Sequence, residues 1–153
     1  MSRDDPIHIL LAEDDPDDRL LTRRALGESP MSASMTTVED GAELMRYLRG
    51  EGEYRDRSKE RWPDLVLLDL NMPGMDGREA LREIKTDAEL RRLPVVVLTT
   101  SEAERDVLES YNLGVNAFVT KPVDFDDLAD AMQALGEFWF DFATLPPEHD
   151  ADE

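Results

Sequence analysis

Three carboxylates of this chain stand directly after two short apolar runs. Glu13 and Asp14 follow the run 7–12. Asp69 follows the run 65–68. Carboxylates that meet within a few ångströms repel one another unless a cation neutralises them. Because the chain has no cysteine, its ligands are mainly oxygens, which favour magnesium. We therefore expect Glu13, Asp14 and Asp69 to hold Mg2+.

Two further apolar runs are followed by side chains that could bind an anionic group from the side opposite the carboxylates. Thr99 follows the run 95–98, and Lys121 stands shortly after the run 117–119. The lysine supplies a fixed positive charge and the threonine supplies a hydroxyl. An acidic cluster with a lysine and a hydroxyl suits a phosphoryl group, whose transfer needs positioning and charge neutralisation more than covalent chemistry.

The apolar runs predict the sheet that brings these side chains together. They are short, rich in Val, Ile and Leu, and without polar alternation, which is typical of parallel strands buried on both faces. Helical segments separate them, so the fold class is α/β with a doubly wound sheet, whose ligands bind at the carboxyl ends of the strands. The expected strands are Ile7–Ala12, Ser34–Val38, Leu65–Leu68, Val95–Leu98 and Ala117–Val119. The expected helices are Asp15–Gly27, Gly41–Leu48, Gly77–Lys85, Ala103–Leu113 and Phe125–Phe140.

Several polar residues and glycines are better explained by backbone structure than by chemistry. Asp15 is expected to cap the first helix, and Asp76 the third. Gly74 and Gly77 shape the loop after Asp69, where a side chain would obstruct the approach. The charged segment Arg49 to Trp62 lacks apolar periodicity and is expected to be a solvated loop. We assign no catalytic role to His8 or His149, because neither has the partners that a catalytic base requires.

Length and composition exclude several classes of protein. The 153 residues suit one domain, expected over 1–145 with a disordered acidic tail at 146–153, and leave no room for a separate output module. A net charge of −19 repels nucleic acid. No apolar run reaches the roughly 20 residues of a membrane span, and no signal peptide is recognised, so we expect a cytoplasmic protein.

Four motifs of the chain, in order and spacing, resemble the receiver domain of two-component response regulators. They are Glu13-Asp14-Asp15-Pro16, the segment 65–77 (LVLLDLNMPGMDG), the segment 95–100 (VVVLTT) and the segment 118–122 (FVTKP). The resemblance covers Ile7 to Leu135. It implies a flavodoxin-like sheet of five parallel strands in the order 2-1-3-4-5, with helices on both faces and, in this chain, an extended last helix.

The same resemblance implies a role for each motif residue. Asp69 would accept a phosphoryl group from a sensor histidine kinase, and both Mg2+ and Lys121 favour the ionised form that this attack requires. Such a protein is not an enzyme beyond its own phosphorylation and dephosphorylation. The metal ligands would be Asp14, Asp69 and the backbone carbonyl of Asn71, with Glu13 assisting largely through water.

The switch residues follow from the resemblance as well. Thr99 would hydrogen-bond the phosphoryl group, Lys121 would pair with it, and Phe118 would be the aromatic switch. Family members often have tyrosine at the aromatic position, and phenylalanine lacks its hydroxyl. The resemblance also implies a cis peptide bond between Lys121 and Pro122.

Four aromatic residues near the end of the chain would be costly to leave in water. We expect them to form a homodimer interface, since aromatics are enriched at interface cores; the alternative is that they fold back on the core. With the long loop before Trp62, this end resembles single-domain response regulators that work with phytochrome-type kinases. The residues are Phe138, Trp139, Phe140 and Phe142.

Two other functions fit parts of the pattern. One is a receiver-like interaction module that works without phosphorylation. The other is a phosphatase of the haloacid-dehalogenase type, which also uses an aspartate nucleophile and magnesium. Its motif requires a second aspartate two residues after the nucleophile, where this chain has Asn71.

Overall fold

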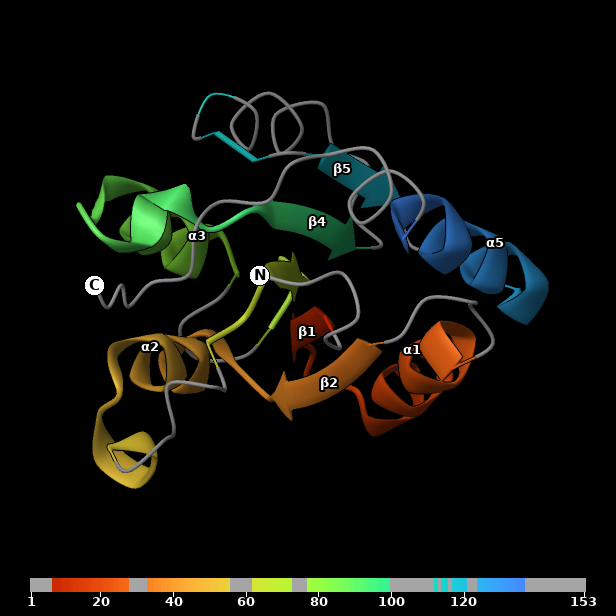
Figure 1. The fold of residues 1–153 in the computed structure, drawn as a ribbon, viewed down its shortest axis with the longest axis horizontal. Coiled ribbons are helices and arrows are strands. Elements are labelled where there is room, and N and C mark those ends of the chain that lie inside the picture. Colours follow the sequence, from red (N-terminus) through yellow and green to blue (C-terminus); the bar gives the residue numbers. More distant parts are fainter. Residues whose placement is uncertain are drawn as a thin grey trace.

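Five parallel strands form the centre of the molecule (Figure 1). The computed structural model describes residues 7–27, 33–55, 62–72, 77–99, 112, 114–115, 117–120 and 124–136. The order of the strands in the sheet is β2-β1-β3-β4-β5, as the resemblance implies. The expected strand boundaries differ from the observed ones by one residue at β2, β4 and β5. The strands are β1 (Ile7–Ala12), β2 (Ala33–Val38), β3 (Leu65–Leu68), β4 (Val95–Thr99) and β5 (Ala117–Thr120).

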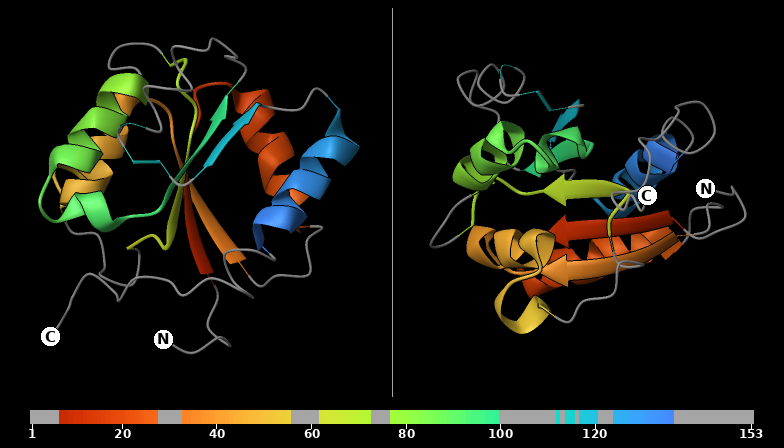
Figure 2. Two further views of the ribbon diagram at one scale, coloured as in Figure 1. Left: turned by 90° about the horizontal axis from the view of Figure 1, so that it is seen from above. Right: turned by 60° about the vertical axis from the view of Figure 1, so that its left-hand side comes forward.

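Helices cover both faces of this sheet, which makes it doubly wound (Figure 2). One pair, α1 and α5, packs on one face, and the pair α2 and α3 packs on the other. The predicted helix over 103–113 lies largely outside the described residues, as does the predicted part of the last helix beyond residue 136. The helices are α1 (Pro16–Gly27), α2 (Gly41–Arg49), α3 (Gly77–Thr86) and α5 (Phe125–Gly136), with short 3-10 turns η1 (Gly52–Tyr54) and η3 (Leu90–Arg92).

The central strands β1 and β3 are largely apolar because they are buried on both sides. All six residues of β1 are buried. Ile9 and Leu11 join the apolar cluster under α1 and α5, whereas Leu10 and Ala12 join the cluster under α2 and α3. Alternate residues of one strand thus enter two cores, which explains the absence of polar alternation in the sequence.

Aspartate side chains cap three of the helices. Oδ1 of Asp15 accepts a hydrogen bond from the backbone N–H of Asp17 at 2.8 Å, which confirms the predicted cap of α1. Asp40 caps α2, and Asp124 caps α5, through equivalent bonds of 2.8 Å. The carboxylate of Asp15 therefore caps α1, although this residue directly follows Glu13 and Asp14 in the sequence.

The connection between α2 and β3 is exposed at most of its described residues, as predicted, but it also contains the turn η1 and two packed aromatic residues. Tyr54 of η1 and Trp62 pack against the apolar cluster. The Tyr54 ring lies 5.0 Å from that of Tyr47 in an edge-to-face arrangement, and its hydroxyl donates to Glu43. Burial and this acceptor raise the pKa of the Tyr54 hydroxyl, which keeps it a hydrogen-bond donor.

A buried histidine lies near the start of β1, at the end of the strand away from Glu13. The residue His8 is 5% exposed. Its Nδ1 lies 3.0 Å from the Ser34 hydroxyl, and its Nε2 lies 3.3 Å from the hydroxyls of both Tyr47 and Thr36. These hydroxyl contacts give the ring a structural place between β1, β2 and α2.

Among the described residues, no helix combines the length and the apolar character that crossing a membrane requires.

Candidate functional site

The ends of β1 and β3 bring the three predicted carboxylates together. The two strands are parallel neighbours, with Ala12 opposite Leu68. The residues that follow them, Glu13 and Asp69, therefore leave the sheet side by side. Glu13, Asp14 and Asp69 each offer one carboxylate oxygen, and these three oxygens lie within 4.8 Å of one another. The cluster stands at the carboxyl edge of the sheet, where ligands of this architecture bind.

Burial and hydrogen bonds give the three acids different surroundings. Glu13 is 2% exposed and Asp69 is 5% exposed, whereas Asp14 is partly open to solvent. Oε2 of Glu13 accepts from the backbone N–H of Asp15 at 3.2 Å, and Oδ1 of Asp69 accepts from that of Asn71 at 3.0 Å. The two buried carboxylates are thus oriented by backbone amides, and the cluster meets solvent at Asp14.

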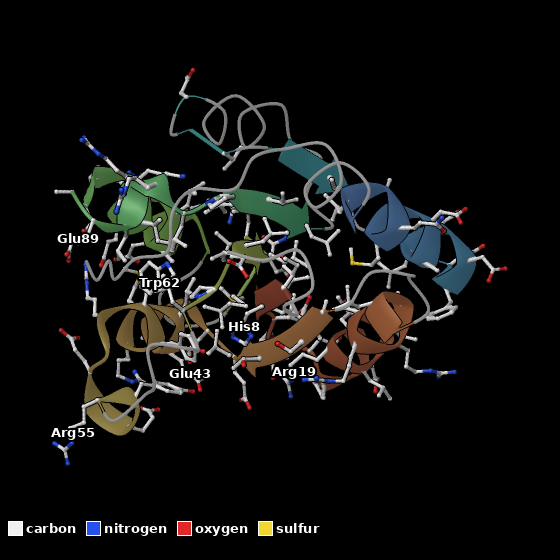
Figure 3. All side chains as sticks on the ribbon, in the orientation of Figure 1. His8, Arg19, Glu43, Arg55, Trp62 and Glu89 are labelled. Atoms are coloured by element: carbon white, nitrogen blue, oxygen red, sulfur yellow. The ribbon has the colours of Figure 1, made fainter. Side chains whose placement is uncertain are left out.

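Two arginines hold the loops that carry these acids, and the sequence reasoning missed both. Arg19 lies on α1 (Figure 3). Its Nη1 donates to the backbone carbonyls of Glu13 at 2.9 Å and Asp14 at 3.1 Å. Arg78 of α3 donates from Nη1 to the carbonyl of Leu70 at 3.3 Å. The only signal in the sequence is that each arginine stands in the first turn of the helix after an acidic loop.

The close approach of α3 to the Asp69 strand requires glycine at residue 77. A Cβ at Gly77 would lie 2.3 Å from the backbone oxygen of Asp69 and 2.6 Å from Cα of Leu70. The N–H of Gly77 donates to the carbonyl of Leu70 at 3.0 Å, which ties the helix to the loop after Asp69. The predicted obstruction by a side chain here is confirmed. The other loop residues assigned to this turn, Gly74 and Asp76, lie outside the described residues.

The remaining predicted site residues are described in part. Thr99 ends β4, and Phe118 lies in β5 opposite Val97. Their side chains lie outside the described part of the chain, as does all of Lys121 with the bond to Pro122. The backbone at Thr99 reaches the same edge of the sheet as the carboxylates. The roles of these residues remain predictions. The aromatic residues over 138–142 also lie outside the described residues.

The donor set of the cluster fits a hard divalent cation. All three groups offer carboxylate oxygens, and no soft ligand belongs to the cluster. Oxygen ligands of this kind are those that Mg2+ prefers, and that ion retains several of its waters. The partly exposed Asp14 leaves room for such waters.

The fold and this site define a class of protein. A parallel sheet in the order 2-1-3-4-5 carries an acidic cluster on β1 and β3, and residues 9–133 match the family described as "Response regulator receiver domain". The chain belongs to the receiver-domain family of response regulators. This membership decides against the phosphatase of the dehalogenase type.

Several relatives share nearly the whole length of the chain. Response regulator Rcp1 of Synechocystis sp. (strain PCC 6803) is 43% identical over 141 residues, which are 92% of this chain and 94% of Rcp1. Among solved structures, the phosphorylated cyanobacterial phytochrome response regulator RcpA matches with a TM-score of 0.86 and 47% identity, over 94% of this chain and all of RcpA.

Two other structures extend the comparison. The Mn2+-bound form of Rcp1 has a TM-score of 0.84 and 43% identity, over 93% of this chain and 100% of that one. Response regulator RPA3017, described in red light signalling of R. palustris, has a TM-score of 0.85 and 36% identity, over 92% of this chain and 99% of that one. The described fold is therefore shared with regulators of light signalling.

Proposed function

We propose that this chain is a single-domain response regulator that accepts a phosphoryl group on Asp69 from a sensor histidine kinase, in a Mg2+-dependent reaction. The observation that carries the proposal is the cluster of Glu13, Asp14 and Asp69 within 4.8 Å. The phosphorylated state of RcpA and the Mn2+-bound state of Rcp1 support it. Because those relatives are regulators of phytochromes or of light signalling, we propose a kinase of the phytochrome class as the partner.

In the proposed reaction, a carboxylate oxygen of Asp69 attacks the phosphorus of a phosphohistidine. The new oxygen–phosphorus bond forms as the nitrogen–phosphorus bond breaks, and the electron pair leaves with the imidazole nitrogen. The hydrogen bond from the N–H of Asn71 holds the Asp69 carboxyl group in one orientation. Bound by Glu13, Asp14, Asp69 and the carbonyl of Asn71, Mg2+ would neutralise charge on the phosphoryl oxygens.

The other predicted residues complete the proposal. Lys121 would pair with one phosphoryl oxygen, and the hydroxyl of Thr99 would donate to another. Drawing Thr99 inward at the end of β4 would free space beside β5. Phe118, whose backbone lies opposite Val97, would then turn inward and change the surface that a downstream partner meets.

The direct test is incubation of the chain with acetyl phosphate followed by intact mass measurement. With MgCl2 present, the mass should increase by one phosphoryl group per chain. With a chelator in place of MgCl2, the mass should remain that of the starting protein. A chain that stays unmodified in both conditions, while a known receiver is labelled in parallel, would favour an interaction module that works without phosphorylation.

Replacing Asp14 with Ala should have opposite effects with and without the cation. Loss of this ligand should weaken Mg2+ binding by about tenfold, or about 1.4 kcal/mol. In chelator, the variant should melt about 2–4 °C higher than wild type, because removing a partly exposed charge from the cluster relieves about 1 kcal/mol of repulsion. Asp17→Ala, an exposed acid outside the cluster, is the control. A lower melting temperature for Asp14→Ala in chelator would contradict the repulsion.

We also propose that the segment 138–142 contributes to a homodimer. Each large aromatic side chain that becomes buried contributes about 1.5–3 kcal/mol, which exceeds a charge repulsion that salt screens beyond about 10 Å. Dimerisation should therefore persist or strengthen as salt rises. A chain truncated after Leu135 should sediment as a monomer that still accepts a phosphoryl group. A full-length monomer at tens of micromolar in low and high salt would instead place the aromatics in the core.

A further inference from the structure

We propose that Arg19 is a positioning residue for the cation site. Its guanidinium group fixes the backbone between β1 and α1, so that the carboxylates of Glu13 and Asp14 face Asp69 before a cation arrives. This inference rests on the proposed function of the cluster. It adds a residue outside the four sequence motifs to the machinery of that site.

The geometry of Arg19 is that of a clamp on two consecutive peptide groups. A single nitrogen, Nη1, donates to the carbonyl oxygen of Glu13 at 2.9 Å and to that of Asp14 at 3.1 Å. The other nitrogen, Nη2, lies 4.0 Å from a carboxylate oxygen of Glu39 in the loop after β2. The side chain is 21% exposed, so water competes only weakly for these contacts. Both carbonyl directions are therefore set by one side chain.

The two ends of the same loop are already held by other bonds. At its start, the N–H of Glu13 donates to the carbonyl of Val38 at 3.0 Å. At its end, the side chain of Asp15 caps α1. Within the described residues, no hydrogen bond holds the carboxylate of Asp14 itself. Its direction depends on the backbone, and Arg19 is the group that holds the backbone there.

Arg19 also carries a positive charge, which by itself would oppose binding of Mg2+ in the same neighbourhood. Removing the charge alone should tighten cation binding. Removing the clamp should weaken it. Lysine separates these two effects, because it keeps the charge but carries it on a flexible stem, without the planar guanidinium group that holds Nη1 in place. We expect the clamp to dominate, since the guanidinium contacts the loop directly while Glu39 offsets part of its charge.

The test is titration of the full chain with MgCl2 by calorimetry, for wild type, Arg19→Lys and Arg19→Gln. Both variants should bind Mg2+ about tenfold more weakly than wild type, or about 1.4 kcal/mol. Arg23→Gln is the matched control, because Arg23 is an exposed arginine one turn further along α1 that donates only to the carbonyl of Met35 among the hydrogen bonds described. This control should bind as wild type does.

Melting in chelator separates positioning from folding. Arg19→Lys should remain folded with a melting temperature close to that of wild type, so the test stands even if Arg19→Gln unfolds. The rate of labelling by acetyl phosphate should recover toward that of wild type at high MgCl2, because Asp69 itself is unchanged. Wild-type affinity in Arg19→Lys together with tighter binding in Arg19→Gln would overturn the proposal and leave only a charge effect.

The failure of this proposal differs from the failure of the proposed function. If wild type binds Mg2+ and is labelled, but both Arg19 variants match it, Arg19 has no positioning role and the function stands. If wild type neither binds Mg2+ nor is labelled, both proposals are overturned together.

Discussion

We expect Asp69→Asn to gain no phosphoryl group from acetyl phosphate, whereas wild type should gain one per chain. The amide replaces the ionised oxygen nucleophile with a neutral group, and it also removes one of the charges that attract the cation. Asparagine has nearly the same shape as aspartate, and its side-chain oxygen can still accept the hydrogen bond from the N–H of Asn71, which Asp69 accepts at 3.0 Å. The fold should therefore survive, and the effect on labelling should be complete. Intact mass measured over time with MgCl2 gives the result.

Asp15→Asn provides the matched control for this substitution. It makes the same chemical change in a loop at the same edge of the sheet, at a side chain whose observed bonds cap α1. Asparagine caps helices as well as aspartate does. This variant should be labelled as wild type is. Labelling of Asp69→Asn at the wild-type rate would show that another residue accepts the phosphoryl group.

Gly77→Ala should be the most destabilising of the substitutions considered. The added Cβ would stand 2.3 Å from the backbone oxygen of Asp69, and backbone atoms cannot yield as a flexible side chain can. Overpacking of this kind costs about 1–3 kcal/mol, and each kcal/mol lowers the melting temperature of a chain of this size by about 2–4 °C. Because the displaced atoms belong to Asp69 and Leu70, labelling should slow as well. Thermal melting and timed mass measurements report the two effects.

Gly27, the last residue of α1, provides a control in which the same glycine-to-alanine substitution is made. A Cβ at Gly27 meets nothing within 4 Å, and its backbone is not among the positive-φ glycines. Gly27→Ala should be neutral or stabilising by up to about 1 kcal/mol, through the lower entropy of the unfolded chain. Equal melting temperatures for Gly77→Ala and wild type would mean that α3 does not approach the backbone of Asp69 so closely.

The sheet and the cluster were predictable because both depend on local sequence. β1 and β3 have the predicted boundaries, since their residues enter two cores and form runs that are apolar except at His8. In a parallel sheet the carboxyl ends of neighbouring strands share one edge, so the position of each acid after its run was enough to bring Glu13 and Asp69 together. The required glycine at residue 77 followed from its place just after the loop that begins at Asp69.

Contacts that depend on how elements dock were not predictable. Arg19 donates to the carbonyls of Glu13 and Asp14, which precede its own helix, and this contact depends on how α1 packs against the sheet. His8 meets Ser34 because the register of β1 and β2 places them opposite each other, and a short strand shows no sign of its register in sequence. Tyr54 was read as part of a charged segment, since the apolar surface that it covers belongs to α2.

The turn η1 is fastened to α2 by contacts between residues that are close in sequence. The Tyr54 hydroxyl donates to Glu43, eleven residues earlier, and Arg46 donates two hydrogen bonds to Glu53, seven residues later, at 2.8 and 3.1 Å. Loops of this length close at little entropic cost. The helix α2 and the turn η1 therefore form one structural unit. A partner protein that displaced α2 would also displace η1.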